Sequence, residues 1–316
     1  MEKRPLVILT GPTAVGKTAL SVAFAKAING EIISADSMQV YRHMDIGSAK
    51  VTKEEMEGVP HHLIDVLEPA EEFNVVLFQK MARQAAEEIE SRGHIPILVG
   101  GTGFYIQALL YNIDFAENDE DRRLRRSLEE IAKEQGASAL YEKLRAVDPE
   151  SCEIIHANNV KRVIRAIEFY EKTGKKISAH NREQRQNISP YRFAYFVLND
   201  DREKIYRQID QRVDLMMERG LVEEVRALRA MGCSRGMVSM QGLGYKEILS
   251  YLEGEISQEE AVYLIKRDTR HFAKRQLTWF KREKEVTWIE KNVFDYSSQN
   301  MLAFMQDFLH EKRIIL

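Results

Sequence analysis

The first hundred residues alternate short apolar runs with longer amphipathic stretches, and this alternation predicts a sheet covered by helices. Apolar runs predict buried strands at residues 6–10, 31–34 and 95–99. Segments with a helical period of hydrophobic positions occur at residues 17–28, 74–92 and 104–110. This rhythm of strand, helix and strand is typical of an α/β fold with a doubly wound parallel sheet.

The pattern changes near residue 114. From residue 119 to about 186 the chain is highly charged and almost free of strand signals, which predicts a helical insertion. Beyond it we predict a strand at 193–198, helices across 202–231, a glycine-punctuated loop at 232–244, a long helix at 257–282 and a last strand at 286–289. We therefore expect three segments: a first part of the α/β core at 1–115, an all-helical insertion at 116–190 and a return to the core at 191–316.

Length and composition narrow the class of protein. A chain of 316 residues suggests two domains or one domain with a large insertion, and 44% hydrophobic residues can bury a full core. No apolar run approaches the length of a membrane span, and the N-terminus passes straight into the first strand without room for a signal peptide. The only cysteines, Cys152 and Cys233, argue against a disulfide framework or a zinc site. We expect a cytoplasmic protein.

The formal net charge of −3 conceals two basic stretches. Residues 158–192 hold nine Lys/Arg against three Glu, and residues 262–284 hold eight Lys/Arg against one Asp and one Glu. Each stretch is either a solvated helix face or a surface for an anionic partner.

The strongest motif is Gly11-Pro12-Thr13-Ala14-Val15-Gly16-Lys17-Thr18, between the first strand and the first helix. This is the strand, glycine turn and helix of a P-loop, whose backbone N–H groups and helix dipole hold phosphate oxygens. Lys17 would reach the terminal phosphate, and Thr18 would offer its hydroxyl to Mg²⁺. An ordinary tight turn is the weaker alternative, and the motif alone does not say which phosphate compound is bound.

A P-loop NTPase normally places a magnesium-binding Asp at the end of a later strand, but here the strand at 95–99 ends in two glycines. The nearest acid is Asp36, which follows the second strand, and Asp65 is a weaker candidate. Asp36 could instead form an Asx-turn or cap a helix.

A second glycine turn, Gly100-Gly101-Thr102-Gly103, stands at the carboxyl end of a strand, where ligands bind in this architecture. Thr102 could orient a substrate group with its hydroxyl. A simple tight connection between strand and helix is the alternative.

The long C-terminal helix has two different faces. On a helical wheel its cationic residues fall within about 60° of one another: Arg267, Arg270, Lys274 and Lys281. The opposite side carries Ile265, Phe272, Trp279 and Phe280. We expect the aromatic side to pack on the core and the cations to face solvent or a cleft.

Together these segments resemble the tRNA dimethylallyltransferase family, and they occur in the family's order along nearly the whole chain. The segments that carry the resemblance are Gly11 to Thr18, Ile33 to Tyr41, Met44 to Lys50, His61 to Asp65, Gly100 to Tyr105, Lys161 to Glu168, Gly242 to Glu247 and Ala273 to Phe280. The C-terminal zinc finger of eukaryotic relatives is absent from the sequence, which implies the bacterial form.

The resemblance implies that a dimethylallyl group passes from dimethylallyl diphosphate to the exocyclic N6 amine of the adenosine immediately 3′ of the tRNA anticodon. It implies Asp36 as the acceptor of the amine proton, with Thr102 and Arg212 at the diphosphate. The diphosphate-binding set is Gly11, Thr13, Ala14, Val15, Gly16, Lys17 and Thr18. The implied cofactor is Mg²⁺, with Thr18 as one ligand.

The target adenosine must be flipped out of its stack, and the resemblance implies that the insertion clamps the anticodon stem-loop. The tRNA-binding set is Asp36, Ser37, Met38, Gln39, Lys161, Arg162, Arg165, Gln241, Gly244, Tyr245 and Lys246. We expect a monomer.

Three other functions remain open on the sequence alone. A P-loop kinase that binds ATP would transfer a γ-phosphate to a small molecule. A prenyltransferase acting on free adenine nucleotides would not need the long basic insertion. A non-catalytic RNA-binding protein would leave the P-loop, Asp36 and Thr102 without a role.

Overall fold

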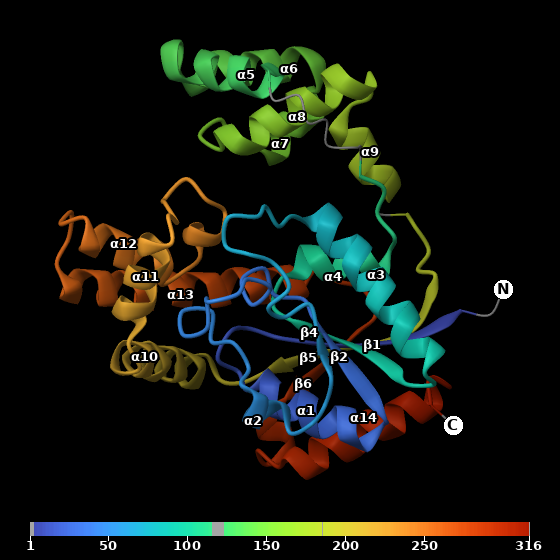
Figure 1. Ribbon diagram of the computed structural model, residues 1–316. Coiled ribbons are helices and arrows are strands. Elements are labelled where there is room, and N and C mark those ends of the chain that lie inside the picture. Colours follow the sequence, from blue (N-terminus) through green and yellow to red (C-terminus); the bar gives the residue numbers. More distant parts are fainter. Residues whose placement is uncertain (1–2, 116–122, 185, 316) are drawn as a thin grey trace. The chain divides into compact units, whose positions relative to one another are not determined.

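The computed structural model describes residues 3–115, 123–184 and 186–315. The chain forms two compact units, one made of Met1–Leu110 with Pro190–Leu316 and the other of Tyr111–Ser189 (Figure 1). Among the described residues, no helix is long and apolar enough to cross a membrane.

The first unit is built on six parallel strands in the order β3-β2-β4-β1-β5-β6. The strands are β1 (Arg4–Thr10), β2 (Gly30–Ser34), β3 (His61–His62), β4 (Ile95–Gly100), β5 (Tyr191–Asn199) and β6 (Val286–Glu290). In the central register, Val7 of β1 lies between Ile97 of β4 and Ala194 of β5. The predicted doubly wound parallel sheet is therefore confirmed.

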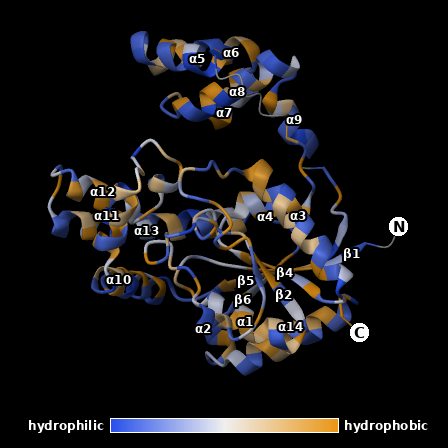
Figure 2. Ribbon diagram, viewed as in Figure 1, coloured by the Kyte–Doolittle hydropathy of each residue, from blue (hydrophilic) through white to orange (hydrophobic). Residues whose placement is uncertain are grey.

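Helices cover both faces of this sheet, which explains why its strands are continuous apolar runs rather than alternating ones. In Figure 1, α1 (Lys17–Ala27) and α14 (Ser298–Glu311) lie on one face, and α3 (Val75–Ser91) and α4 (Gly103–Leu110) lie on the other. Figure 2 shows hydrophobic residues gathered in the strands, whereas the helices alternate hydrophobic and hydrophilic positions. Leu6 to Leu9 of β1 are fully buried, and each such side chain contributes about 1.5–3 kcal/mol.

Four more helices form a cluster beside the sheet: α10 (Arg202–Glu218), α11 (Leu221–Ala230), α12 (Tyr245–Leu252) and α13 (Gln258–Phe280). Side chains satisfy the free N–H groups at two of their starts, because Asp201 caps α10 and Ser257 caps α13. Both α10 and α12 pack along α13. Short helical turns complete the unit: α2 (Lys53–Met56), η1 (Ser239–Gln241) and η2 (Lys291–Phe294).

The second unit contains only helices within its described residues: α5 (Arg123–Glu134), α6 (Gly136–Val147), α7 (Pro149–Ile154), α8 (Val160–Thr173) and α9 (Ile177–Gln184). Its core holds Leu128, Leu140 and Val163. Buried Asp148 caps α7 through Ser151 and accepts hydrogen bonds from the backbone N and Oγ of Ser178 at 3.0 and 2.6 Å. The helical prediction for this stretch is confirmed, except at residues 119–122 and 185, which lie outside the described residues.

Several elements of the sheet unit were not predicted, among them α2, α12, β3 and α14; β3 and α14 show why. β3 has only the two polar residues His61 and His62, so it shows no hydrophobic alternation. α14 follows the last strand and buries Met301, Met305 and Leu309 in the core that it shares with α1. Both elements exist because the sheet supplies a neighbour for them.

Candidate functional site

The P-loop follows β1, and three of its residues have a positive φ: Gly11 (φ 150°), Ala14 (φ 64°) and Gly16 (φ 95°). A Cβ at Gly11 would lie 2.3 Å from the carbonyl oxygen of Leu198, so only glycine fits beside β5. Gly16 precedes α1 and gives it no side-chain cap. The first N–H groups of α1 are thus available to an anion.

Lys17 closes over this loop. Its Nζ donates hydrogen bonds to the carbonyl oxygens of Gly11 at 2.9 Å and Pro12 at 2.8 Å. Burial and the nearby Arg212 charge lower the pKa of Lys17 to about 7, although Asp36 opposes the shift. Phosphate oxygens would compete for the same ammonium group.

Arg212 reaches the P-loop from α10, where its Nη1 donates to Thr13 Oγ1 at 3.3 Å. Burial lowers the pKa of Arg212, and Asp36 opposes this effect. The neighbouring acids on α10 are engaged elsewhere, Asp210 with Arg270 and Asp214 with Lys266, both at 2.6 Å. Arg212 therefore faces the P-loop and not a surface ion pair.

Gln276 joins the two glycine turns and was not predicted as a site residue. Its Oε1 accepts a hydrogen bond from the Thr13 N–H at 2.9 Å, and its Nε2 donates to the Gly101 carbonyl at 3.0 Å. A sequence signal existed, because Gln276 falls on the apolar face of α13, where a buried amide needs partners.

The second glycine turn lies directly against its neighbours. A Cβ at Gly100 would lie 2.4 Å from the Ala35 carbonyl oxygen, and one at Gly101 would lie 2.1 Å from Gln276 Nε2. A Cβ at Gly103 would lie 2.2 Å from the Trp279 ring. Glycine is needed at these positions because α13 and the residue after β2 pack so closely against the turn that a side chain would not fit.

Gly101→Ala is expected to displace Gln276 and to lower the free energy of unfolding by about 1–3 kcal/mol, the usual cost of overpacking. Because Gln276 holds the Thr13 N–H, affinity for inorganic diphosphate should also fall. Chemical denaturation and calorimetric binding measure the two effects. Gly236→Ala is the control, since nothing lies within 4 Å of its Cβ position. If the two variants had the same free energy of unfolding and the same affinity for diphosphate, the proposed role of Gln276 would be wrong.

Asp36 follows β2 and forms the Asx-turn that the sequence allowed. Its Oδ1 accepts hydrogen bonds from the N–H groups of Met38 at 2.8 Å and Gln39 at 3.3 Å. Oδ2 makes no hydrogen bond within the described residues, so it remains available to a ligand. Asp65 is exposed and ion-paired with Lys50, so the weaker candidate acid is engaged outside the cavity.

One cavity of about 120 Å³ brings many of the predicted residues together, although Lys17 and Thr18 are not among its lining residues. Its lining includes Thr13, Gly101, Arg212 and Gln276, which are joined by hydrogen bonds. Asp36, Ser37, Met38 and Thr102 line it as well. Its apolar wall comes from α10, α13 and the loop before α12: Ile209, Val213, Met216, Leu243, Ile265 and Phe272. Phe272, expected to pack on the core, instead faces this cavity.

The predicted residues around α12 take different positions. Tyr245, predicted as a tRNA contact, is fully buried, and its hydroxyl donates to Glu224 at 2.8 Å, so its side chain is engaged within the fold. Gly244 caps α12, with its N–H donated to Glu247 at 2.8 Å. Gln241 is exposed to solvent. Lys246 forms an ion pair with Glu247, in which its Nζ lies 3.4 Å from Oε1. Gln39, also in the predicted tRNA-binding set, donates a hydrogen bond from its Nε2 to the Ala49 carbonyl oxygen at 3.2 Å.

In the second unit, Lys161 and Arg162 are exposed on the first turn of α8. Arg165 is half-buried, and burial lowers its pKa beside the Arg125–Glu168 ion pair. The three predicted cations therefore differ, because only the first two point fully into solvent.

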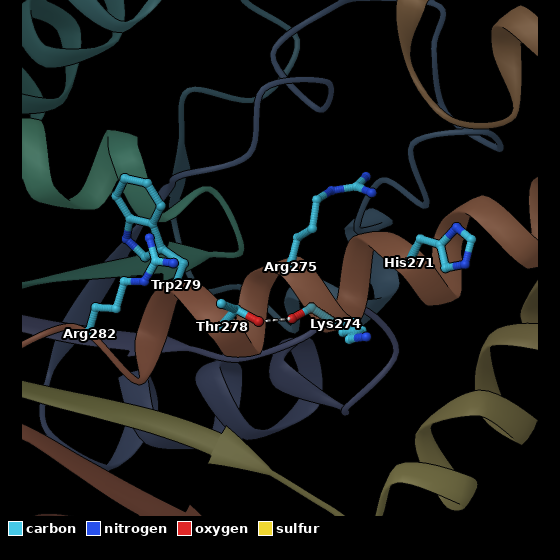
Figure 3. Close-up of a pocket in the computed structure, with 6 residues that line it drawn as sticks. All are labelled: His271, Lys274, Arg275, Thr278, Trp279 and Arg282. Carbon is cyan, nitrogen blue, oxygen red and sulfur yellow. Dashed lines mark hydrogen bonds between the residues drawn. The ribbon is translucent and has the colours of Figure 1, made fainter. Parts of the chain in front are cut away.

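The outer side of α13 carries a second, basic cavity of about 440 Å³ (Figure 3). Its lining residues are His271, Lys274, Arg275, Thr278, Trp279 and Arg282. Figure 3 shows these six side chains along α13 and just after it, among them the three cations Lys274, Arg275 and Arg282. The predicted cation row is divided, since Arg267 pairs with Asp268 at 2.8 Å and Arg270 pairs with Asp210.

Comparisons with known proteins agree with one another. Residues 39–283 match the family model described as IPP transferase. The tRNA dimethylallyltransferase of Lachnoclostridium phytofermentans is 63% identical over 99% of both chains. A crystal structure of the tRNA isopentenylpyrophosphate transferase of Bacillus halodurans is similar with a TM-score of 0.74, at 44% identity and 98% coverage of both chains. A eukaryotic dimethylallyltransferase acting on tRNA matches with a TM-score of 0.83, at 31% identity over 98% of this chain and 80% of that one. The chain belongs to the IPP transferase family.

Proposed function

We propose that this enzyme transfers the dimethylallyl group of dimethylallyl diphosphate to the N6 amine of the adenosine immediately 3′ of the tRNA anticodon, releasing diphosphate. The observation that carries the proposal is a single cavity that joins Thr13 and Arg212, the carboxylate of Asp36 and a wall of apolar side chains. A five-carbon prenyl group needs such a wall, whereas the γ-phosphate of a kinase substrate does not. The family supports the same reaction.

The leaving group needs positive charge and N–H donors as the bond between the allylic carbon and oxygen breaks. Lys17, Arg212 and the P-loop N–H groups would supply them, and Thr13 and Gln276 would hold the loop in place. Arg212 already lines the cavity, so it needs little reorganisation in the transition state, whereas Lys17 would exchange its bonds to the Gly11 and Pro12 carbonyls for phosphate oxygens. Thr102 would orient the same substrate with its hydroxyl.

The adenosine amine is a weak nucleophile because its lone pair is conjugated with the ring. Its nitrogen forms a bond to the allylic carbon while the electron pair of the carbon–oxygen bond leaves with the diphosphate. The amine proton then passes to Asp36 Oδ2. The Met38 and Gln39 N–H groups hold Oδ1 and fix the orientation of the carboxylate.

Magnesium fits the proposal as a partner of the diphosphate. The Thr18 hydroxyl is exposed at the start of α1 and makes no hydrogen bond within the described residues. Mg²⁺ commonly keeps several waters and is held by few protein ligands plus substrate phosphates. Thr18 would hold the ion, which when bound neutralises charge on the leaving diphosphate.

Transfer RNA would meet the basic surfaces of both units. Lys161 and Arg162 offer exposed charge on α8, and Lys274, Arg275 and Arg282 offer it on α13. Such contacts bind phosphates without reading sequence, and the target base would be flipped toward Asp36. We propose a monomer that acts where tRNA is found, in the cytoplasm.

Replacing Lys161 and Arg162 together by Ala should weaken tRNA binding and lower the slope of log K against log salt by roughly one unit for each contact removed. Affinity for dimethylallyl diphosphate should stay unchanged. Filter binding over a salt series measures the slope. Lys133→Ala with Lys143→Ala is the matched control, because it removes the same charge from exposed positions of the same unit. An unaltered slope in the first variant would exclude α8 from the tRNA surface.

Binding of dimethylallyl diphosphate should take up a proton above neutral pH. The pKa of Lys17 is lowered to about 7 in the free enzyme, and a bound anion raises it because it favours the charged form. Affinity should therefore decrease as pH rises above 7, by up to about tenfold per unit. Calorimetry at pH 8 in buffers of different ionisation enthalpy measures the uptake. Lys17→Arg, which stays charged, should show none; wild-type binding without proton uptake would refute the prediction.

The proposed reaction is tested by incubating the enzyme with Mg²⁺, labelled dimethylallyl diphosphate and either bulk tRNA or free adenine nucleotides. We expect label in the tRNA alone. Label in free adenine nucleotides would favour the nucleotide prenyltransferase. Transfer of a γ-phosphate from ATP to a small molecule, without prenyl transfer, would favour the kinase.

A further inference from the structure

A carboxylate of α11 binds the backbone of a loop that lies far from it in sequence. Glu224 Oε2 accepts hydrogen bonds from the N–H groups of Asp45 at 2.9 Å and Ile46 at 2.7 Å, and Oε1 accepts one from Gly47 at 3.0 Å. Three consecutive N–H groups thus converge on one side chain. Such an arrangement fixes the path of the loop, because each donor would otherwise need water or another acceptor.

Tyr245 completes this arrangement from α12. Its hydroxyl donates to Glu224 Oε1 at 2.8 Å and accepts a hydrogen bond from the Ser48 N–H at 3.1 Å. Burial raises the pKa of Tyr245 well above its usual value, so the hydroxyl stays protonated. Glu224 and Tyr245 together therefore hold four consecutive N–H groups, from residue 45 to residue 48.

Two glycines allow the segments to meet. A Cβ at Gly47 would lie 2.5 Å from the Tyr245 ring, and a Cβ at Gly242 would lie 2.5 Å from Met38 Cε. Tyr245 thus packs against the loop at 47, and the turn before it packs against Met38. These contacts account for two motifs, residues 44–50 and 242–247, to which the proposed chemistry gives no direct role.

The held loop forms part of the cavity. Gly47 and Ser48 line it together with Asp36, Ser37 and Met38. Thr13 and Arg212, which would contact the diphosphate, make none of the bonds to Glu224 or Tyr245. The effect of the arrangement should accordingly fall on the side of the cavity where Asp36 would receive the acceptor base.

We propose that Glu224 and Tyr245 are positioning residues that hold the 45–48 loop as the acceptor-side wall of the cavity. The inference rests on the proposed function, because it assigns this wall to the adenosine of tRNA. Neither residue touches the substrates; both act through the backbone of the loop.

The test uses Tyr245→Phe, which removes only the hydroxyl, and Glu224→Gln, which removes an acceptor oxygen. Glu223→Gln is the matched control, since Glu223 lies next to Glu224 but is exposed and 3.4 Å from Arg226. We expect the KM for tRNA to rise about tenfold in Glu224→Gln and severalfold in Tyr245→Phe, as the loss of one or two such hydrogen bonds predicts. The KM for dimethylallyl diphosphate should stay within about twofold of the wild-type value.

Hydrogen exchange gives a readout that does not depend on activity. The amides of residues 45–48 should exchange faster in both variants than in the wild type and the control. An unchanged KM for tRNA, or equal rises in both KM values, would overturn the positioning role and leave Glu224 a stabilising residue only. A wild-type enzyme that transfers no prenyl group to tRNA would instead refute the proposed function.

Discussion

Asp36→Asn is expected to lower kcat by about 10²–10⁴, the usual effect of removing a general base, with little change in tRNA affinity. The asparagine side chain keeps the Oδ1 acceptor that binds the Met38 and Gln39 N–H groups, so the turn should persist. It replaces the free oxygen by an amide, which cannot take the proton. Single-turnover rates and tRNA binding measure the two quantities.

Asp65→Asn provides the control for this variant, because Asp65 is exposed and paired with Lys50. Its kcat should match the wild type. If Asp36→Asn retains most of its kcat, the carboxylate serves only its Asx-turn and the proposed proton acceptor is wrong.

Lys17→Ala is expected to lower kcat/KM for dimethylallyl diphosphate by about 10²–10³, or about 2.7–4 kcal/mol, the typical loss when one donor to a developing anion is removed. The ammonium group would contact the departing diphosphate, whose charge is greatest in the transition state. The kcat should therefore fall together with affinity. Steady-state kinetics with tRNA at saturation measure the loss.

Lys26→Ala is the matched control for Lys17, since Lys26 lies on the same helix but is exposed and paired with Glu57 at 2.6 Å. It should leave both kinetic constants unchanged. Diphosphate affinity and turnover that survive in Lys17→Ala would remove the P-loop from the reaction.

The sheet could be predicted because its strands are buried on both faces and therefore appear as continuous apolar runs. β3 could not, since it has only two polar residues, and it is held to β2 by backbone pairing and by the His62 side chain, which contacts Glu31 of β2 at 2.7 Å. The glycine turn at 100–103 could be identified in the sequence, but the reason why glycine is needed at these positions could not. Only the structure shows that Gly101 makes room for Gln276 and Gly103 for Trp279.

The candidate site shows the same limit. The motifs pointed to the P-loop, Asp36 and Thr102, and the family resemblance implied Arg212; Thr13 of the P-loop, Asp36, Thr102 and Arg212 line one cavity. The family resemblance implied Tyr245 as a tRNA contact, but its side chain is buried and donates a hydrogen bond to Glu224, which the sequence does not show. The apolar wall from α10 and α13 was missed because its residues have the spacing of ordinary core positions.

The central claim is that Asp36 and the P-loop transfer a dimethylallyl group to one exocyclic amine. A synthetic anticodon stem-loop with ¹⁵N at the N6 position of the adenosine 3′ of the anticodon tests it directly. After reaction with dimethylallyl diphosphate and Mg²⁺, nucleoside mass spectrometry and NMR should show the new carbon–nitrogen bond at the labelled nitrogen alone, with one diphosphate released per bond. Prenylation at another nucleotide, or diphosphate release without the bond, would contradict the account.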